Sequence, residues 1–148
     1  MSIADRTTKT TWRGSLDLGT GVLSGSSSSA LDGLALTWAS RTKAPGGKTS
    51  PEELLAAAHS SCFSMALTIK LAEHHLEAER LEVTATVSLS DVNGLPTIDR
   101  SRLVVRGLVP GADEKRFVAI VDEASRLCPV SRLFASAKID VDAALLSS

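Results

Sequence analysis

The feature that most constrains the fold is an uninterrupted helical segment in the middle of the chain. After Pro51, the sequence as far as Glu77 contains no glycine and no further proline. Ser50 as N-cap, Pro51 at the first helical position and Glu53 at the end of a capping box form a helix-start pattern. Apolar residues then recur at steps of three and four: Leu55, Ala58, Cys62, Met65 and Ile69. This spacing predicts one long helix over 51–77 with a single apolar stripe that includes Cys62.

Strand patterns surround this helix. Short strands with glycine- and serine-rich connections are predicted before it, over Lys9–Leu18, Val22–Ser24 and Leu34–Trp38. After it, alternating apolar residues over Leu81–Leu89 and again over Ile98–Val109 flank an Asn93-Gly94 turn. The last two strands are therefore expected to form a hairpin.

A second amphipathic helix is predicted over Ala112–Leu127, and a last strand over Ala137–Ala144. The expected inner face of the helix consists of Phe117, Ile120, Val121 and Ala124. Proline disfavours helix in the residue before it and suits a first helical position, so Cys128, before Pro129, should cap a following helical segment. The predicted order is β-β-β-α-β-β-α-β, an α+β fold with mostly antiparallel pairing, and we expect one domain over residues 1–148.

Composition and charge exclude several classes of function. The 148 residues are 43% hydrophobic, and 16 basic residues against 17 acidic ones give a formal net charge of -1. No basic tract suggests nucleic acid as a partner. The first residues lack the apolar core of a secretion signal, and no uncharged apolar run approaches the roughly 20 residues that span a bilayer. We therefore expect a cytoplasmic protein that does not bind membranes.

The apolar character of the central helix has a further consequence. The stretch from Leu54 to Leu71 carries small or apolar residues on nearly every side. A helix of this kind is buried on more than one face, here against its own sheet and against a second copy. The sequence thus predicts a homodimer.

The two cysteines are the residues with the most reactive side chains. In a reducing compartment they are inert core thiols, metal ligands or redox-active groups. Cys62 lies on an apolar stripe, which favours an inert core thiol. Cys128 lies at a predicted helix start, where unpaired N–H groups favour the thiolate, although it could simply cap a turn. Local position alone would make Cys128 the more acidic thiol.

Two charged residues are candidates to assist a thiol. Arg41 stands at the end of a predicted strand, and Glu52 stands in the first turn of the long helix. An arginine near a thiol lowers its pKa and can donate hydrogen bonds to a peroxide oxygen. Glu52 lies about 15 Å from Cys62 along a regular helix, so either an arginine bridges them or another subunit intervenes. Alternatively, Glu52 only complements the helix dipole.

A metal site is a weaker alternative. His59 and Cys62 share a helix face and could bind a metal together with Cys128 and either His74 or His75. No compact ligand pair accompanies them, so His59 is better explained as a helix-face residue that hydrogen-bonds locally. The sequence also lacks a phosphate-binding loop and a serine-nucleophile elbow, which leaves nucleotide binding and serine hydrolysis unsupported.

Three segments resemble one known family. Thr49–Leu67 (TSPEELLAAAHSSCFSMAL) closely resembles the signature of the OsmC/Ohr family of bacterial hydroperoxide reductases. The second element, Cys128-Pro129-Val130-Ser131 followed by Arg132 to Phe134, resembles the family's resolving-cysteine motif. Trp12-x-Gly14-x-Leu16 and the following Gly19-x-Gly21 resemble the OsmC branch, so the resemblance runs across essentially the whole chain.

The resemblance assigns roles that local position does not. It implies that Cys62 attacks the peroxide and that Cys128 resolves the product, the reverse of the acidity order above. It implies that Arg41 activates the thiolate and that Glu52 holds this arginine. In the Ohr branch the arginine comes from nearer the N-terminus, which leaves Arg13 as an alternative. Family members are intertwined dimers with sites at the interface, which would account for the distance between Glu52 and Cys62.

The implied activity is reduction of organic hydroperoxides, and of hydrogen peroxide, through a Cys62 sulfenic acid and a Cys62–Cys128 disulfide. An external dithiol would reduce this disulfide, namely a lipoyl protein, another dithiol protein or a small thiol, so no bound cofactor or metal is expected. An apolar pocket around Cys62, lined by Phe63, Met65 and leucine residues, would favour organic substrates. A non-enzymatic redox sensor and an inactive member that binds small hydrophobic ligands remain the alternatives.

Overall fold

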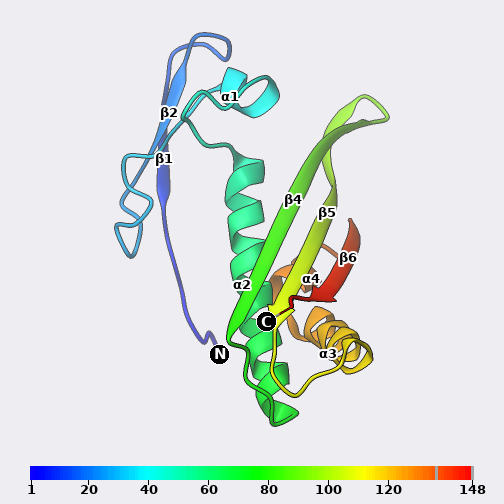
Figure 1. Cartoon of the computed structure of the whole chain (residues 1–148). Helices are drawn as coiled ribbons and strands as arrows, with labels where there is room; N and C mark the ends of the chain where they lie inside the picture. Colours follow the sequence, from blue (N-terminus) through cyan, green and yellow to red (C-terminus); the bar gives the residue numbers. More distant parts are fainter. Residues whose placement is uncertain (136, 148) are drawn as a thin grey trace. The chain divides into compact units, whose positions relative to one another are not determined.

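The computed structural model describes residues 1–135 and 137–147 (Figure 1). Its chain divides into two units, Met1–Leu54 and Leu55–Ser148. The first unit contains a three-stranded antiparallel sheet in the order β1-β2-β3, formed by β1 (Lys9–Arg13), β2 (Thr20–Ser24) and β3 (Ala35–Leu36). The first strand ends earlier than predicted because Gly14 adopts a φ of 93°, which turns the chain toward Gly19.

The third predicted strand is wrong at its C-terminal end, because a short helix, α1 (Trp38–Thr42), begins there. Thr37 accepts a hydrogen bond from the Ser40 backbone N–H, and the Ser40 hydroxyl accepts one from the Thr37 backbone N–H. This reciprocal capping box stabilises a helix start where alternation alone predicted a strand. Arg41 consequently lies in a helix and not at the end of a strand.

The long helix α2 (Pro51–Glu73) begins where the sequence predicted. The Glu53 backbone N–H donates to the Ser50 hydroxyl, while the Glu53 carboxylate accepts a hydrogen bond from the Thr49 hydroxyl. The helix ends before the predicted Glu77 because His75 adopts a φ of 58°. A residue in this left-handed region closes a helix, and backbone N–H groups that follow bond back to its last turn.

The second unit contains a three-stranded sheet in the order β4-β5-β6. β4 (Arg80–Val92) and β5 (Leu95–Leu108) form the predicted hairpin around Asn93-Gly94, where both residues have positive φ, as this tight turn requires. β6 (Lys138–Leu145) pairs with β5 in parallel. Between these strands the chain forms α3 (Glu114–Leu127) and the short α4 (Pro129–Leu133).

The α+β class, mostly antiparallel pairing and the order of the main elements are confirmed, with α1 and α4 as two additional short helices. The core of the second unit lies between α2, α3 and β5. The predicted inner face of α3 is confirmed, since all four of its residues are buried. These observations place Cys128, at the junction of α3 and α4, directly in the core.

The predicted stripe of α2 is not its core face. Met65 and Ile69 are 69% and 51% exposed, whereas Phe63, Leu67 and Leu71 are buried. Because α2 is apolar on nearly every side, helical periodicity fits more than one face. The core takes the face with the bulkier side chains.

By length and composition, α2 could cross a membrane, although it has charged residues in its first and last turns. It is the one such helix among the residues that the structure describes. Its buried face, however, contributes Phe63, Leu67 and Leu71 to the core. The core helix of a soluble protein has the same length and composition.

Candidate functional site

The two cysteines meet in the second unit. Cys62 projects from α2 and is partly exposed, whereas Cys128 is fully buried. Both are free thiols, Cys62 packs against the buried cluster that contains Cys128, and the neighbouring Cys128 thiol contributes to the raised pKa of Cys62. The two thiols are thus adjacent but differ in their access to solvent.

A backbone N–H group contacts the buried thiol. The Ser131 N–H donates to the Cys128 Sγ over 3.5 Å. Cys128 adopts an extended ψ of 115° before Pro129 and caps α4, as the sequence predicted. The first turn of α4 therefore contacts the Cys128 sulfur.

The surroundings of Cys62 do not by themselves produce a reactive thiolate. Burial raises the pKa of the Cys62 thiol, the Val130 N–H lowers it, and the adjacent Cys128 raises it further. The net effect is an increase of this pKa above the ordinary value. A nearby cation would lower this pKa and favour the thiolate.

The first unit brings Arg41 and Glu52 together. Arg41 Nε lies 3.0 and 3.2 Å from the two Glu52 carboxylate oxygens, and Nη2 lies 2.7 Å from Oε1. The Glu52 side chain is 11% exposed and that of Arg41 is 29% exposed. Arg41 also lies 6.0 Å from the ring centroid of Trp38. Two N–H groups of the guanidinium are therefore held by a nearly buried carboxylate.

Arg13, the alternative arginine, projects from β1 and is exposed. Among the residues that the structure describes, no carboxylate lies within ion-pair distance of it. The four main candidates thus form two pairs, Arg41 with Glu52 in the first unit and Cys62 with Cys128 in the second.

His59 does not hydrogen-bond locally, which corrects the sequence interpretation. Its side chain is fully buried, with Nδ1 2.6 Å from the Ser101 hydroxyl on β5 and Nε2 2.9 Å from the Ser131 hydroxyl on α4. Burial lowers the pKa of His59, which favours the neutral ring. Sequence reasoning did not identify either serine as a partner. The only available signal was Ser101, a small polar residue within the alternating pattern of β5.

The proposed metal site finds no geometric support. His74 bonds instead to the Glu123 carboxylate at 3.0 Å. Within residues 1–135 and 137–147, no group of three or more His, Cys, Asp and Glu side chains is placed to hold a metal ion.

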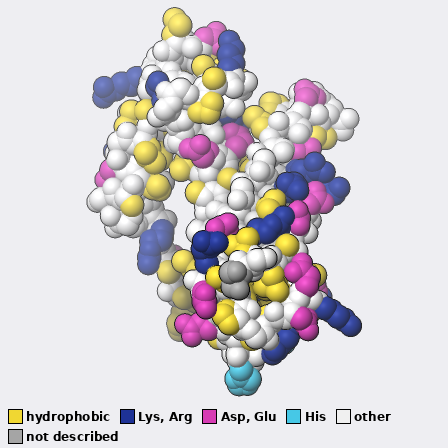
Figure 2. All heavy atoms as spheres, viewed as in Figure 1, with side chains coloured by type: hydrophobic (Ala, Val, Ile, Leu, Met, Phe, Trp, Pro, Cys, Tyr) yellow, Lys and Arg dark blue, Asp and Glu magenta, His cyan; other side chains and the backbone are white. Residues whose placement is uncertain are grey.

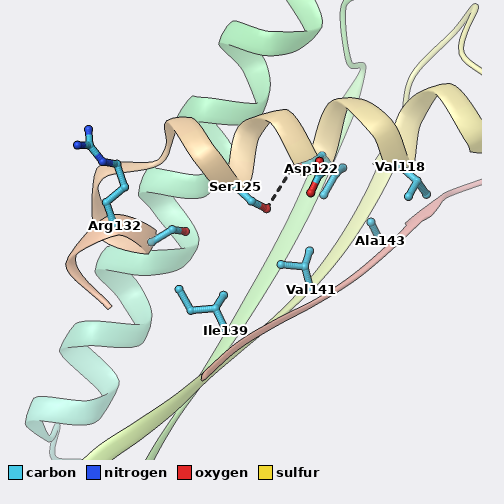
Figure 3. Close-up of a pocket in the computed structure, with 9 residues that line it drawn as sticks. Val118, Asp122, Ser125, Arg132, Ile139, Val141 and Ala143 are labelled. Carbon is cyan, nitrogen blue, oxygen red and sulfur yellow. Dashed lines mark hydrogen bonds between the residues drawn. The ribbon is translucent and has the colours of Figure 1, made fainter. Parts of the chain in front are cut away.

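The second unit has two larger hollows. One of about 460 Å³ lies between α3, α4 and β6 and is lined in part by Ser125, Ser131 and Ile139 (Figure 3). The other, of about 740 Å³, runs along α2 and β4 and includes Met65. Cys62 lines neither, and Phe63 is fully buried in the core. Phe63 is buried and Met65 is exposed, so the two side chains face in different directions around α2, and the apolar pocket around Cys62 stays a prediction.

The surface charges show no single-sign patch on the face in Figure 2, where basic and acidic side chains are interspersed. On β5 and β6 they pair across the strands, as in Arg100 with Asp140 and Arg106 with Asp142. This pattern agrees with the near-zero net charge.

An α+β scaffold that places a partly exposed thiol against a buried one defines a dithiol protein. A family model described as OsmC-like protein matches residues 44–143. The chain is 36% identical over 136 residues to "Peroxiredoxin OsmC" of Escherichia coli (strain K12), covering 92% of this chain and 93% of the relative. It is 32% identical over 109 residues to "Organic hydroperoxide resistance protein" of Xanthomonas axonopodis pv. citri, covering 72% and 73%.

A solved structure supports the same assignment. The organic hydroperoxide resistance protein OhrB of Bacillus subtilis superposes with a TM-score of 0.70 at 28% identity, covering 95% of this chain and 98% of that one. The chain therefore belongs to the OsmC-like family, which confirms the resemblance found in the sequence. The names of these relatives support a peroxidase-like role in the family.

Proposed function

We propose that this protein is a thiol-dependent reductase of hydroperoxides with two catalytic cysteines. The observation that carries the proposal is the difference in access between the adjacent thiols. A peroxide can reach the partly exposed Cys62, while the fully buried Cys128 is suited to react only with its neighbour. The family to which the chain belongs supports the same assignment.

In the proposed cycle, the Cys62 thiolate attacks one oxygen of the hydroperoxide, and the O–O bond breaks. The leaving alkoxide takes up a proton and departs as an alcohol, or as water from hydrogen peroxide. Cys128 then attacks the Cys62 sulfenic acid, which forms the disulfide and releases water. An external dithiol reduces this disulfide by thiol–disulfide exchange and becomes oxidised itself.

We propose that Arg41 supplies the cation that Cys62 requires, with Glu52 holding its guanidinium. Burial raises the pKa of the Cys62 thiol, so a neighbouring positive charge would lower that pKa toward the working range. Glu52 engages Nε and Nη2, and Arg41 Nη1 makes no hydrogen bond to the described part of the chain. That group could donate to the thiolate or to a peroxide oxygen. Arg13 remains the alternative.

We further propose a cytoplasmic homodimer whose 148 residues act as one domain. The exposure of Met65 and Ile69 on α2 supports a second copy, because this helix otherwise leaves apolar side chains in water. Organic hydroperoxides are the preferred substrates in this proposal, and the reductant is a lipoyl protein, another dithiol protein or a small thiol. These assignments follow the names and the resemblance of the relatives.

The test is peroxide consumption by the purified protein with a dithiol reductant, compared with Cys62→Ser and Cys128→Ser. We expect wild type to turn over, Cys62→Ser to be inactive and Cys128→Ser to stop as an oxidised thiol. Consumption of no more than one equivalent by wild type, despite fresh dithiol, would indicate a redox sensor. No oxidation of Cys62 at all would indicate a ligand-binding member of the family.

A further inference from the structure

The buried contacts of His59 connect three elements around the two thiols. Its ring bonds to Ser101 on β5 through Nδ1 and to Ser131 on α4 through Nε2. It also stacks on Phe134, directly after α4, with ring centroids 5.2 Å apart. Both ring nitrogens have a hydroxyl partner. Because the His59 side chain is buried away from water, loss of either hydroxyl would leave a ring nitrogen without a hydrogen-bond partner, which costs stability.

α4 depends on these contacts for its position. It has only five residues, and Leu133 is 73% exposed. On one side, Ser131 and Arg132 line the hollow between α3, α4 and β6, so few packed side chains restrain the helix there (Figure 3). Ser131 and Phe134, two of the few buried side chains in this segment, both contact His59.

The same short segment begins at Cys128, which is the N-cap of α4 and accepts a hydrogen bond from the Ser131 N–H over 3.5 Å. Because this bond lies within the first turn, Cys128 moves together with α4. A displacement of α4 would therefore change the position of Cys128 relative to Cys62 on α2. The anchor at the Ser131 hydroxyl lies on the residue whose N–H meets Cys128.

We propose that His59 is a positioning residue that holds the first turn of α4, and Cys128 with it, against α2 through the Ser131 hydroxyl. This inference deepens the proposed function, since it concerns the same two cysteines and rests on their redox role. His59 exchanges no proton with substrate in this scheme. It acts by fixing the geometry in which Cys128 reaches Cys62.

The two serines offer a matched pair of variants. Ser131→Ala and Ser101→Ala each remove one hydroxyl and each leave one nitrogen of His59 without a partner, so their urea midpoints should shift comparably. Only Ser131→Ala releases α4. We expect it to slow formation of the Cys62–Cys128 disulfide by roughly three- to tenfold, the effect of one hydrogen bond, while Ser101→Ala stays within about twofold of wild type. Ser131→Thr keeps a hydroxyl and should restore the rate.

The readouts do not depend on peroxide turnover. Diamide, an oxidant of dithiols, drives the disulfide in a single turnover, and alkylation of Cys62 by iodoacetamide as a function of pH reports its pKa. The Cys128 thiol is the titratable group beside Cys62 and helps to raise its pKa. We expect Ser131→Ala to change the pKa of Cys62 and Ser101→Ala to leave it unchanged, because only Ser131→Ala releases the turn that carries Cys128.

Equal changes in the two alanine variants, or no change in either, would overturn the proposal. Should Ser131→Ala not fold, His59→Gln and His59→Asn replace it, because a Gln amide reaches the position of Nε2 and an Asn amide that of Nδ1. We then expect His59→Gln to form the Cys62–Cys128 disulfide at the wild-type rate and His59→Asn to form it slowly. The reverse order would refute the proposal. If wild type fails to turn over peroxide, the proposed function fails, but this comparison of thiol reactivity still holds.

Discussion

Replacing Glu52 by glutamine tests whether its ion pair with Arg41 serves the thiol or only the fold. Glu53→Gln is the matched control, because it removes the same charge from the same helical turn and leaves Arg41 paired. Glu53 is exposed and bonds to the Thr49 hydroxyl. Any loss of helix-dipole stabilisation is common to both variants, so their difference isolates the contact with Arg41.

The expected magnitude follows from the burial of the pair. Exposed pairs contribute about 0–1 kcal/mol, and breaking a buried pair costs about 3–5 kcal/mol. Side-chain exposures of 29% for Arg41 and 11% for Glu52 lie between these cases. We therefore expect Glu52→Gln to lower the free energy of unfolding by about 2 kcal/mol relative to Glu53→Gln.

Urea denaturation measures this difference. With a slope of about 2 kcal/mol per molar, the midpoints should differ by about 1 M. The catalytic efficiency with a hydroperoxide should fall about tenfold or more in Glu52→Gln alone, since an unheld guanidinium loses its orientation. A Glu52→Gln variant that is destabilised but fully active would show that the pair is structural. Identical behaviour of the two variants would refute the reasoning altogether.

Three further predictions concern the second unit. Phe63→Ala should lower the free energy of unfolding by about 3–5 kcal/mol in urea denaturation, because the ring is fully buried in the core; a loss below about 1 kcal/mol would contradict its placement. Met65→Asp should convert a dimer to a monomer in light scattering without loss of helical circular dichroism, since the exposed stripe of α2 is the proposed contact, and an unchanged mass would exclude that contact. The stability that His59 contributes should be complete above its unfolded pKa of 6.5 and decline as the pH falls toward its lowered folded pKa, because the unfolded state then binds the extra proton. The difference in free energy of unfolding between wild type and His59→Gln should therefore shrink below pH 6.5, and a difference that grows would reverse the assignment.

Local signals in the sequence were sufficient for most elements of the fold. The Asn93-Gly94 turn, the start of α2 at Pro51 and the cap at Cys128 each depend on residues within a few positions of one another. The reciprocal bonds of Thr37 and Ser40 are equally local, but the alternation around them is also typical of a strand. Competition between two local patterns, and not a distant contact, explains the error at α1.

The core face of α2 and the partners of His59 could not be read in the same way. Helical periodicity fits any face of a helix that is apolar nearly all round, and the packing of α3 and β5 selects the one with Phe63. Ser101 and Ser131 are 42 and 72 residues away from His59 along the chain. Such contacts follow from the tertiary fold, and a single sequence carries no local signal for them.

Local position in the sequence predicted Cys128 as the more acidic thiol, whereas the family resemblance implies Cys62 as the attacking one. The structure explains this difference by the access of each thiol to solvent. Cys128 occupies the cap position and accepts a hydrogen bond from the Ser131 N–H, yet its side chain is fully buried in the core. Cys62 is disfavoured as a thiolate by burial, but it is the one of the two with a surface open to solvent. A peroxide must touch the sulfur it oxidises, whereas a resolving thiol must meet only a neighbouring sulfur. Access therefore favours Cys62 for the attack in the proposed cycle, and in that proposal an arginine lowers its pKa.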